Sequence, residues 1–286
     1  MFSLEGTFDI HVHASPDVIQ RLGDDLEISR KCKEAGMCGI AVKGMQESTT
    51  SRAYYVNKIL DGFRMVGGIC LNYPVGGLNP SAVDTCLRTG GRIVWMPTLQ
   101  SKFHAGLKGK LGKGSAGLYY YNPAGSTGIT VFDENGELLP EVKEIVALIK
   151  EHNALLATSH LSPKEIIALA KYCEKEKVKI SLTHLGWTPE YNMELAQEAI
   201  AHGANVELTA VTFGGYTHKM KIGDCVEFIQ TLGREHLVLA TDAGAIRFAQ
   251  PCEYLRTFAE NLIIGGIPEK DIRYMMTERP LSLIEE

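Results

Sequence analysis

The stretch TFDIHVHASPD, residues 7–17, places His11 and His13 one residue apart within an apolar run. Side chains two positions apart in a β-strand lie on the same face, so both imidazoles are expected side by side. Isolated histidines in a buried strand are costly, because their polar atoms lose water. Neutral imidazole nitrogens are common zinc ligands, so the pair suggests a metal site, and a hydrogen-bonded pair of core histidines is the alternative.

Further polar residues stand where other apolar runs end. They are Lys43 in AVKGM, His160 in ATSHL, His184 in SLTHLG and Asp242 in LATDAG. In an α/β barrel the carboxyl ends of the strands meet at one face, where active sites are built. Histidines and a carboxylate that converge on such a face favour metal binding over core packing.

Apolar runs of strand length alternate with amphipathic segments of helical periodicity. The expected strands are TFDIHVH (7–13), GIAVKGM (39–45), RMVGGICLN (64–72), RIVWMPTL (92–99), ALLATSH (154–160), KISLTHLG (179–186), NVELTA (205–210) and LVLATDAG (237–244). Such apolar strands are typical of a parallel sheet covered by helices. The pattern predicts an α/β fold, a (β/α)8 TIM-type barrel in one domain spanning residues 1–286, with an open doubly wound sheet as the alternative.

Residues 100–128 interrupt this alternation with seven glycines and four lysines. Long loops inside a compact domain usually serve function, so we expect a Gly-rich lid over the end of the barrel that carries the site. The next stretch, ITVFDENGELLP, predicts a β-hairpin that turns at Asn135-Gly136.

The net charge of −5 and the lack of a basic block argue against nucleic acid or a membrane surface as partner, and leave a small-molecule substrate. No apolar run approaches the roughly 20 residues that span a bilayer, and the first residues lack a signal-peptide pattern. The seven cysteines show no C-x-x-C spacing, so we expect reduced thiols in a cytoplasmic protein. None of these features indicates an oligomeric state.

The order of H-x-H on strand one, His on strands five and six and Asp on strand eight resembles the amidohydrolase superfamily. The stretches FDIHVHASPD, GGLNP and VWMPT are similar to a subgroup of small bacterial and archaeal members. The resemblance covers nearly the whole chain and implies a metal-dependent hydrolase on a distorted barrel. By position, it implies that His11, His13, His160 and Asp242 are metal ligands. It also implies that His184 is a ligand of a second metal or a base beside the water.

One departure from this pattern lies at the end of strand four. Binuclear members usually carry a carboxylated lysine or a glutamate there, whereas this chain has WMPTLQ. One divalent ion is therefore expected rather than two, with Zn²⁺ first and Mn²⁺, Fe²⁺ or Ni²⁺ also suited to the ligands. Lys43 is the nearest compensating residue, and three readings are open: a carboxylated bridge, an ammonium for an anionic substrate, or a side chain that extends to solvent.

These features predict hydrolysis of a C–N or ester bond in a small substrate, which is anionic if Lys43 binds it as an ammonium. Asp242 is expected to move a proton, and His184 to orient the water, stabilise the oxyanion or bind a second metal. The candidates for substrate binding are Lys43, His104, Arg21, Arg247 and His218. The alternatives are a one-metal decarboxylase or hydratase of the same superfamily, and a non-catalytic binding protein that holds a metal.

Overall fold

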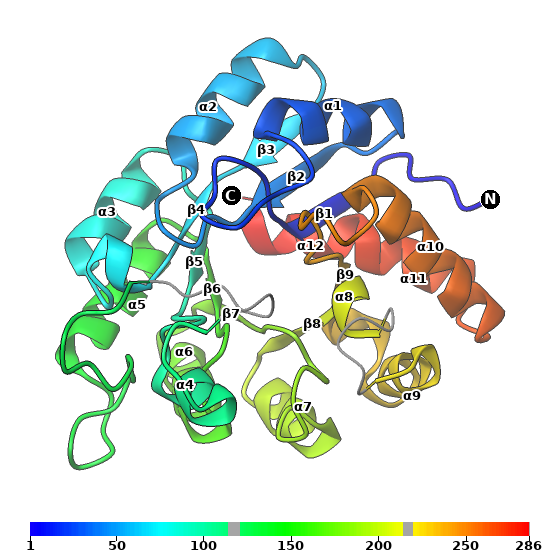
Figure 1. Ribbon diagram of the computed structural model, residues 1–286. Coiled ribbons are helices and arrows are strands. Elements are labelled where there is room, and N and C mark those ends of the chain that lie inside the picture. Colours follow the sequence, from blue (N-terminus) through cyan, green and yellow to red (C-terminus); the bar gives the residue numbers. More distant parts are fainter. Residues whose placement is uncertain (114–120, 214–219, 286) are drawn as a thin grey trace.

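The computed structural model describes residues 1–113, 121–213 and 220–285. Parallel strands lie at its centre and helices surround them (Figure 1). The strands are β1 (Phe8–Val12), β2 (Gly39–Val42), β3 (Arg64–Val66), β4 (Gly68–Cys70), β5 (Ile93–Trp95), β6 (Leu155–Ala157), β7 (Lys179–Leu182), β8 (Asn205–Thr209) and β9 (Leu237–Ala240). Their hydrogen-bonded order is β1-β2-β3 and β4-β5-β6-β7-β8-β9, the order of the chain.

The third predicted strand is divided at Gly67 into β3 and β4. Helix α2 (Thr50–Ile59) begins directly against this glycine: a Cβ at position 67 would lie 2.7 Å from the Cα of Thr50. We therefore count β3 and β4 as one interrupted strand, and all eight predicted strands are present.

Backbone hydrogen bonds join the first strand to the last and close the ring. The amide of His13 donates to the carbonyl of Ala243, and the amide of Asp242 donates to the carbonyl of His11, each at 2.8 Å. Gly244 permits this approach, because its φ is +129° and a Cβ there would lie 1.8 Å from the His13 carbonyl oxygen. The predicted (β/α)8 barrel is confirmed.

Helices alternate with the strands as the apolar periodicity predicts. Beside α2 they are α1 (Asp25–Glu34), α3 (Pro80–Arg88), α5 (Pro140–Glu151), α6 (Pro163–Glu176), α7 (Met193–Ala201), α9 (Ile222–Leu232) and α10 (Pro251–Ile264). Helix α6 begins at the predicted capping box, in which Ser162 caps the backbone of Glu165 and the Glu165 side chain returns to the Ser162 amide. Short elements that the periodicity does not predict are η1 (Tyr73–Val75), α8 (Ala210–Phe213) and η2 (Arg234–His236).

The C-terminal segment forms two helices, α11 (Glu269–Met276) and α12 (Glu278–Ile284). Leu283 and Ile284 of α12 belong to the same buried cluster as Phe8, Ile93 and Leu155, which stand at or near the beginnings of their strands. Helix α12 therefore closes the end of the barrel opposite to the strand ends that carry the histidines.

The expected lid at 100–128 is only partly a loop. Helix α4 (Lys102–Lys108) begins at Ser101, whose hydroxyl accepts a hydrogen bond from the His104 amide, and ends at the left-handed Gly109. The expectation of a loop was wrong for α4, and residues 114–120 of the expected lid lie outside the described part of the chain. The turn at Asn135-Gly136 is present, with one antiparallel bridge between Phe132 and Leu138.

All seven cysteines are free thiols, as predicted, and all but Cys38 are buried. Within the described ranges, no helix has both the length and the apolar character required to cross a membrane.

Candidate metal centre

His11 lies beside His13 at the carboxyl end of β1. Their ring centroids are 5.3 Å apart, and both side chains are buried. Nδ1 of His11 lies 2.9 Å from Oε1 of Glu207, and Nδ1 of His13 donates to the Lys43 carbonyl oxygen at 2.8 Å. The strand periodicity thus placed the two rings correctly, and each is oriented through its Nδ1 atom.

Asp242 follows β9 and faces both rings. Its Oδ1 atom lies 3.0 Å from Nε2 of His13 and 3.2 Å from Nε2 of His11. These three side chains form one of two groups, among the described residues, whose ligand atoms all lie within 4.8 Å of one another. The backbone φ of Asp242 is +55°, a left-handed conformation that costs a non-glycine residue energy and is concentrated at functional sites.

The hydrogen-bond partners determine which nitrogens carry hydrogen. A carbonyl oxygen only accepts, so Nδ1 of His13 is protonated, and burial lowers the pKa of His13 well below 6.5, which keeps the ring neutral. Its Nε2 is therefore a bare lone pair that faces a carboxylate oxygen. Two acceptors at 3.0 Å repel each other, and a shared cation makes the contact favourable.

The same reasoning applies to His11. Lys43 Nζ is a donor that lies 3.4 Å from Nε2 of His11, so Nε2 of His11 is also an acceptor. Nδ1 of His11 then carries the hydrogen and donates it to Oε1 of Glu207. Two bare imidazole nitrogens and one carboxylate oxygen thus converge on one point.

His184 stands after β7, with its ring 4.9 Å from that of His11. Its Nδ1 atom is buried without a hydrogen-bond partner, 3.8 Å from Glu207 Oε1 and 3.9 Å from Asp242 Oδ2. Its φ of +60° is left-handed, like that of Asp242. An orphaned buried nitrogen of this kind is expensive unless a ligand completes it.

His160 lies at the edge of this arrangement, 5.4 Å from the His184 ring. Its Nδ1 atom is 2.9 Å from Nδ1 of His104, and Trp187 stacks on its ring at 4.3 Å. Of the five predicted ligands, His11, His13 and Asp242 therefore converge, His184 adjoins them, and His160 belongs to neither group of close ligand atoms.

Glu207 is a site residue that the strand-end reasoning missed. It lies inside β8, is buried, and forms the second group of close ligand atoms with His11 and His184. Burial raises its pKa to about 8, an effect that the Lys43 charge opposes. The available signal was a lone carboxylate in the otherwise uncharged strand NVELT.

Lys43 does not extend to solvent, so that reading is wrong. Its side chain is buried, with Nζ 3.4 Å from His11 Nε2 and 5.7 Å from the centroid of the Trp95 ring. The described residues provide no carboxylate partner for its ammonium, which is costly in a buried position.

The other substrate-binding candidates are dispersed. Arg21 donates twice to Asp17 within a buried ion pair, and Arg247 is exposed with its guanidinium 5.0 Å from the Phe248 ring. His104 is buried against His160, and His218 lies outside the described residues.

The residues fit a divalent cation. Bare nitrogens on His11 and His13, a carboxylate oxygen on Asp242 and the orphaned nitrogen of His184 together are the mixture of imidazole and carboxylate donors that Zn²⁺ and neighbouring transition metals prefer.

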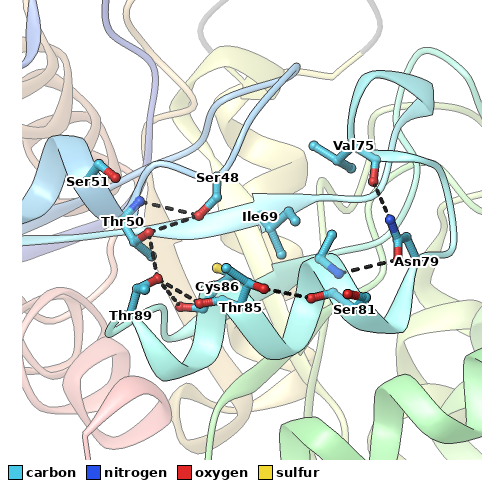
Figure 2. Close-up of a pocket in the computed structure, with 11 residues that line it drawn as sticks. Ser48, Thr50, Ser51, Ile69, Val75, Asn79, Ser81, Thr85, Cys86 and Thr89 are labelled. Atoms are coloured by element: carbon cyan, nitrogen blue, oxygen red, sulfur yellow. Dashed lines mark hydrogen bonds between the residues drawn. The ribbon is translucent and has the colours of Figure 1, made fainter.

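A groove of about 480 Å³ lies elsewhere, between the start of α2 and helix α3. Figure 2 shows that its hydroxyl groups bond to one another and to the backbone, as in the contact of Thr89 with Thr50 at 2.9 Å. None of its lining residues is charged, so it offers little to a polar ligand beyond ordinary surface contacts.

Several solved structures share this architecture. An amidohydrolase from Pseudomonas aeruginosa matches 98% of this chain and 95% of its own, with a TM-score of 0.66 and 14% identity. A β-aspartyl dipeptidase from Fervidobacterium islandicum AW-1, in complex with a β-Asp-Leu dipeptide, covers 98% and 75%, with a TM-score of 0.63 and 12% identity. An organophosphorus hydrolase from Deinococcus radiodurans covers 99% and 93%, with a TM-score of 0.58 and 12% identity. The resemblance to amidohydrolases is thereby confirmed for the fold.

At the level of sequence, no curated protein matches significantly. The model of a family described as "Family of unknown function (DUF6282)" matches residues 6–207, which include His11, His13 and Glu207. The chain therefore belongs to the family DUF6282, and its fold is that of the amidohydrolases.

Proposed function

We propose that this protein is a metal-dependent hydrolase that cleaves a C–N or ester bond in a small, anionic substrate. The observation that carries the proposal is the convergence of bare Nε2 atoms of His11 and His13 on Oδ1 of Asp242. The hydrolases with the same barrel support it, among them a dipeptidase whose bound dipeptide contains a C–N linkage.

His11, His13 and Asp242 would hold one divalent ion, Zn²⁺ in first place, and His160, whose ring lies 5.4 Å from that of His184, would be a further ligand. When bound, the ion supplies Lewis acidity, which polarises a carbonyl and allows water to ionise near neutral pH. Asp242 Oδ2, which lies 3.9 Å from His184 Nδ1, accepts the proton of the attacking water and returns it to the leaving group. His184 Nδ1, buried and unpaired, forms the hydrogen bond that orients the water or the oxyanion.

Lys43 supports the anionic character of the substrate. A cation at His11 Nε2 adds positive charge beside the Lys43 ammonium, 3.4 Å from that nitrogen. A negative group is needed to offset both charges, and a substrate carboxylate or phosphate supplies it. Carboxylation of Lys43 itself is the alternative source of the negative charge.

A one-metal decarboxylase or hydratase is the second candidate, and Trp95, which offers no bridging ligand for a second ion, is consistent with it. This residue ends β5, where binuclear members of the superfamily carry a bridging ligand, and its ring lies 6.2 Å from that of His11. A site with one ion suits either reaction, and release of CO₂ without hydrolysis would identify the second candidate.

The test begins with elemental analysis of protein purified without added metal, which we expect to show close to one divalent ion per chain. His13→Ala should lose most of that ion, whereas His236→Ala, an exposed histidine, should retain it. The wild type should then hydrolyse members of a panel of amides, lactones and esters that carry an anionic group. Full occupancy in His13→Ala would refute the site, and a loaded but inactive wild type would indicate a metal-holding binding protein.

A further inference from the structure

His104, in α4, is not one of the proposed metal ligands, but its side chain contacts one of them, His160. Ser101 joins the two histidines through the backbone: its hydroxyl donates to the His160 carbonyl at 2.6 Å and accepts from the His104 amide at 3.0 Å. The imidazoles meet as well, with 2.9 Å between their Nδ1 atoms and ring planes within 10° of parallel. Trp187 packs over both rings.

The hydrogen in this contact can be located. Nε2 of His104 lies 3.0 Å from the Lys113 carbonyl oxygen, which only accepts, so Nε2 carries a hydrogen. The partners of the buried His104 ring are a carbonyl oxygen and a second imidazole, and no described carboxylate contacts it to favour the charged form, so the ring is neutral and its Nδ1 is bare. Nδ1 of His160 must then be the donor in the contact between the two rings.

A neutral imidazole that carries hydrogen on Nδ1 has a lone pair on Nε2. His160 is neutral as well, because its buried ring is hydrogen-bonded to an imidazole and no described carboxylate contacts it to favour the charged form. Its Nδ1 faces His104, so its Nε2 faces away from His104 with a lone pair, the form in which an imidazole binds a metal. The opposite tautomer would present an N–H group that binds no metal.

The Lys113 carbonyl, which accepts the hydrogen bond from His104, is kept in place by hydrogen bonds of the adjacent residues. The Gly112 amide donates to the Leu99 carbonyl at 2.9 Å, and the Asn122 side chain donates to the Leu111 carbonyl at 3.1 Å. These bonds fix the short segment 109–113 that follows α4 and keep its last carbonyl directed at His104.

We propose that His104 is a positioning residue for His160. Its Nε2 donates to the Lys113 carbonyl, so its Nδ1 accepts from Nδ1 of His160 and holds His160 in the tautomer whose Nε2 is free to bind a metal. This inference rests on the proposed function for the role of His160 as a ligand. The tautomer itself does not, because the hydrogen bonds that set it contain no metal.

The first test is ¹⁵N NMR of histidine-labelled, metal-free protein, in which nitrogen shifts separate the two tautomers. His160 is assigned by loss of its signals in His160→Asn. We expect hydrogen on Nδ1 of His160 in the wild type and in His104→Asn, whose amide oxygen can replace the accepting Nδ1. His104→Phe keeps a flat ring under Trp187 without an acceptor, so His160 should populate both tautomers. A wild-type His160 with hydrogen on Nε2 would overturn the proposal.

The second test is the affinity for Zn²⁺, measured by competition with a chromophoric chelator. Removing the hydrogen-bond partner of a ligating histidine typically weakens metal binding by about 10- to 100-fold, and we expect this loss in His104→Phe but not in His104→Asn or His236→Phe. Equal affinity in His104→Phe and wild type, with a changed tautomer, would refute the positioning role. If the wild type binds no Zn²⁺ and yet shows the expected tautomer, the proposed function fails while the hydrogen-bond chain stands.

Discussion

Asp242 gives its two carboxylate oxygens different neighbours. Oδ1 faces the Nε2 atoms of His11 and His13, whereas Oδ2 faces His184. The hydrogen bond from its own amide to the His11 carbonyl holds the left-handed backbone that this orientation requires. One oxygen is thus placed to bind a cation while the other remains available to carry a proton.

The separate roles of the two Asp242 oxygens predict how Asp242→Asn should behave. The amide keeps one ligating oxygen but loses the basicity, and general acid–base catalysis typically contributes about 10²–10⁴-fold in rate. We expect kcat to fall by that order with a much smaller change in KM, and metal occupancy to decrease without being lost. A near wild-type kcat would leave Asp242 as a ligand only.

His184→Asn provides the comparison at the neighbouring position. If His184 acts beside the water, the variant should lose rate comparably but keep its metal by elemental analysis. A fall in metal content in proportion to the fall in rate would instead assign His184 as a ligand.

The negative charge needed beside Lys43 comes either from the substrate or from carboxylation of the lysine itself. ¹³C NMR of protein equilibrated with ¹³C-bicarbonate and Zn²⁺ separates these two cases. We expect no carbamate signal, because the single-ion site needs no bridge, and we expect Lys43→Met to raise KM for an anionic substrate more than for a neutral analogue. A carbamate resonance that disappears in Lys43→Met would show that the lysine is carboxylated.

At the scale of elements, the strand interruption at Gly67 determines how closely α2 approaches the barrel. The Cα and amide nitrogen of Thr50 occupy the space of a Cβ, at 2.7 and 2.8 Å, and both are backbone atoms that cannot move alone. The residue at position 67 is therefore constrained by packing between elements and not by its own conformation.

Gly67→Ala should accordingly destabilise the protein by about 1–3 kcal/mol, the usual cost of overpacking a core. Gly106→Ala is the matched control, since Gly106 lies within α4 with nothing near its missing Cβ. Alanine at position 106 should raise the free energy of unfolding by at most about 1 kcal/mol, because alanine has a higher helix propensity than glycine. Urea denaturation measures both, and equal stability of Gly67→Ala and wild type would contradict the close packing of α2.

For the whole molecule, burial of the site has opposite effects on its two kinds of titratable group. It lowers the pKa of His11, His13, His160 and His184 well below 6.5. It raises the pKa of Glu207 to about 8 and that of Asp9, which accepts from Thr241 beside the site, to about 7. Below about pH 7 the folded state thus keeps both the histidines neutral and the two carboxyl groups largely protonated.

The sign of each contribution follows from proton binding. Below pH 6.5 the unfolded chain binds protons on these histidines that the folded chain does not, so stability decreases as the pH falls. The two carboxyl groups bind protons only in the folded chain above about pH 4, so they reduce stability as the pH rises toward 8. Four histidines outnumber two carboxyl groups, and the metal-free protein should be most stable close to pH 6.5.

Urea denaturation in the presence of a chelator between pH 5 and 8 tests this expectation. Glu207→Gln removes one of the carboxyl groups and should flatten the alkaline side. Metal-free protein as stable at pH 5 as at pH 6.5 would contradict the burial of four neutral histidines.

The sequence by itself determined the barrel and the convergence of His11, His13 and Asp242. Both depend on local regularities: apolar runs of strand length, a side-chain period of two, and parallel strand ends that meet at one face. It did not distinguish α4 from a loop, because its glycine and lysine content resembles a flexible segment and its stability comes from the Ser101 cap and the contact with His160.

Only the tertiary structure decided how each imidazole is oriented and which polar residues join the site. Glu207 inside a strand could face the axis or the helices, and closure of the barrel placed it against His11. Lys43 became buried because Trp95, from a different strand, lies beside it. His104 meets His160 across 56 positions of the chain. Hydrogen bonds between distant segments depend on the relative placement of elements, which no local pattern encodes.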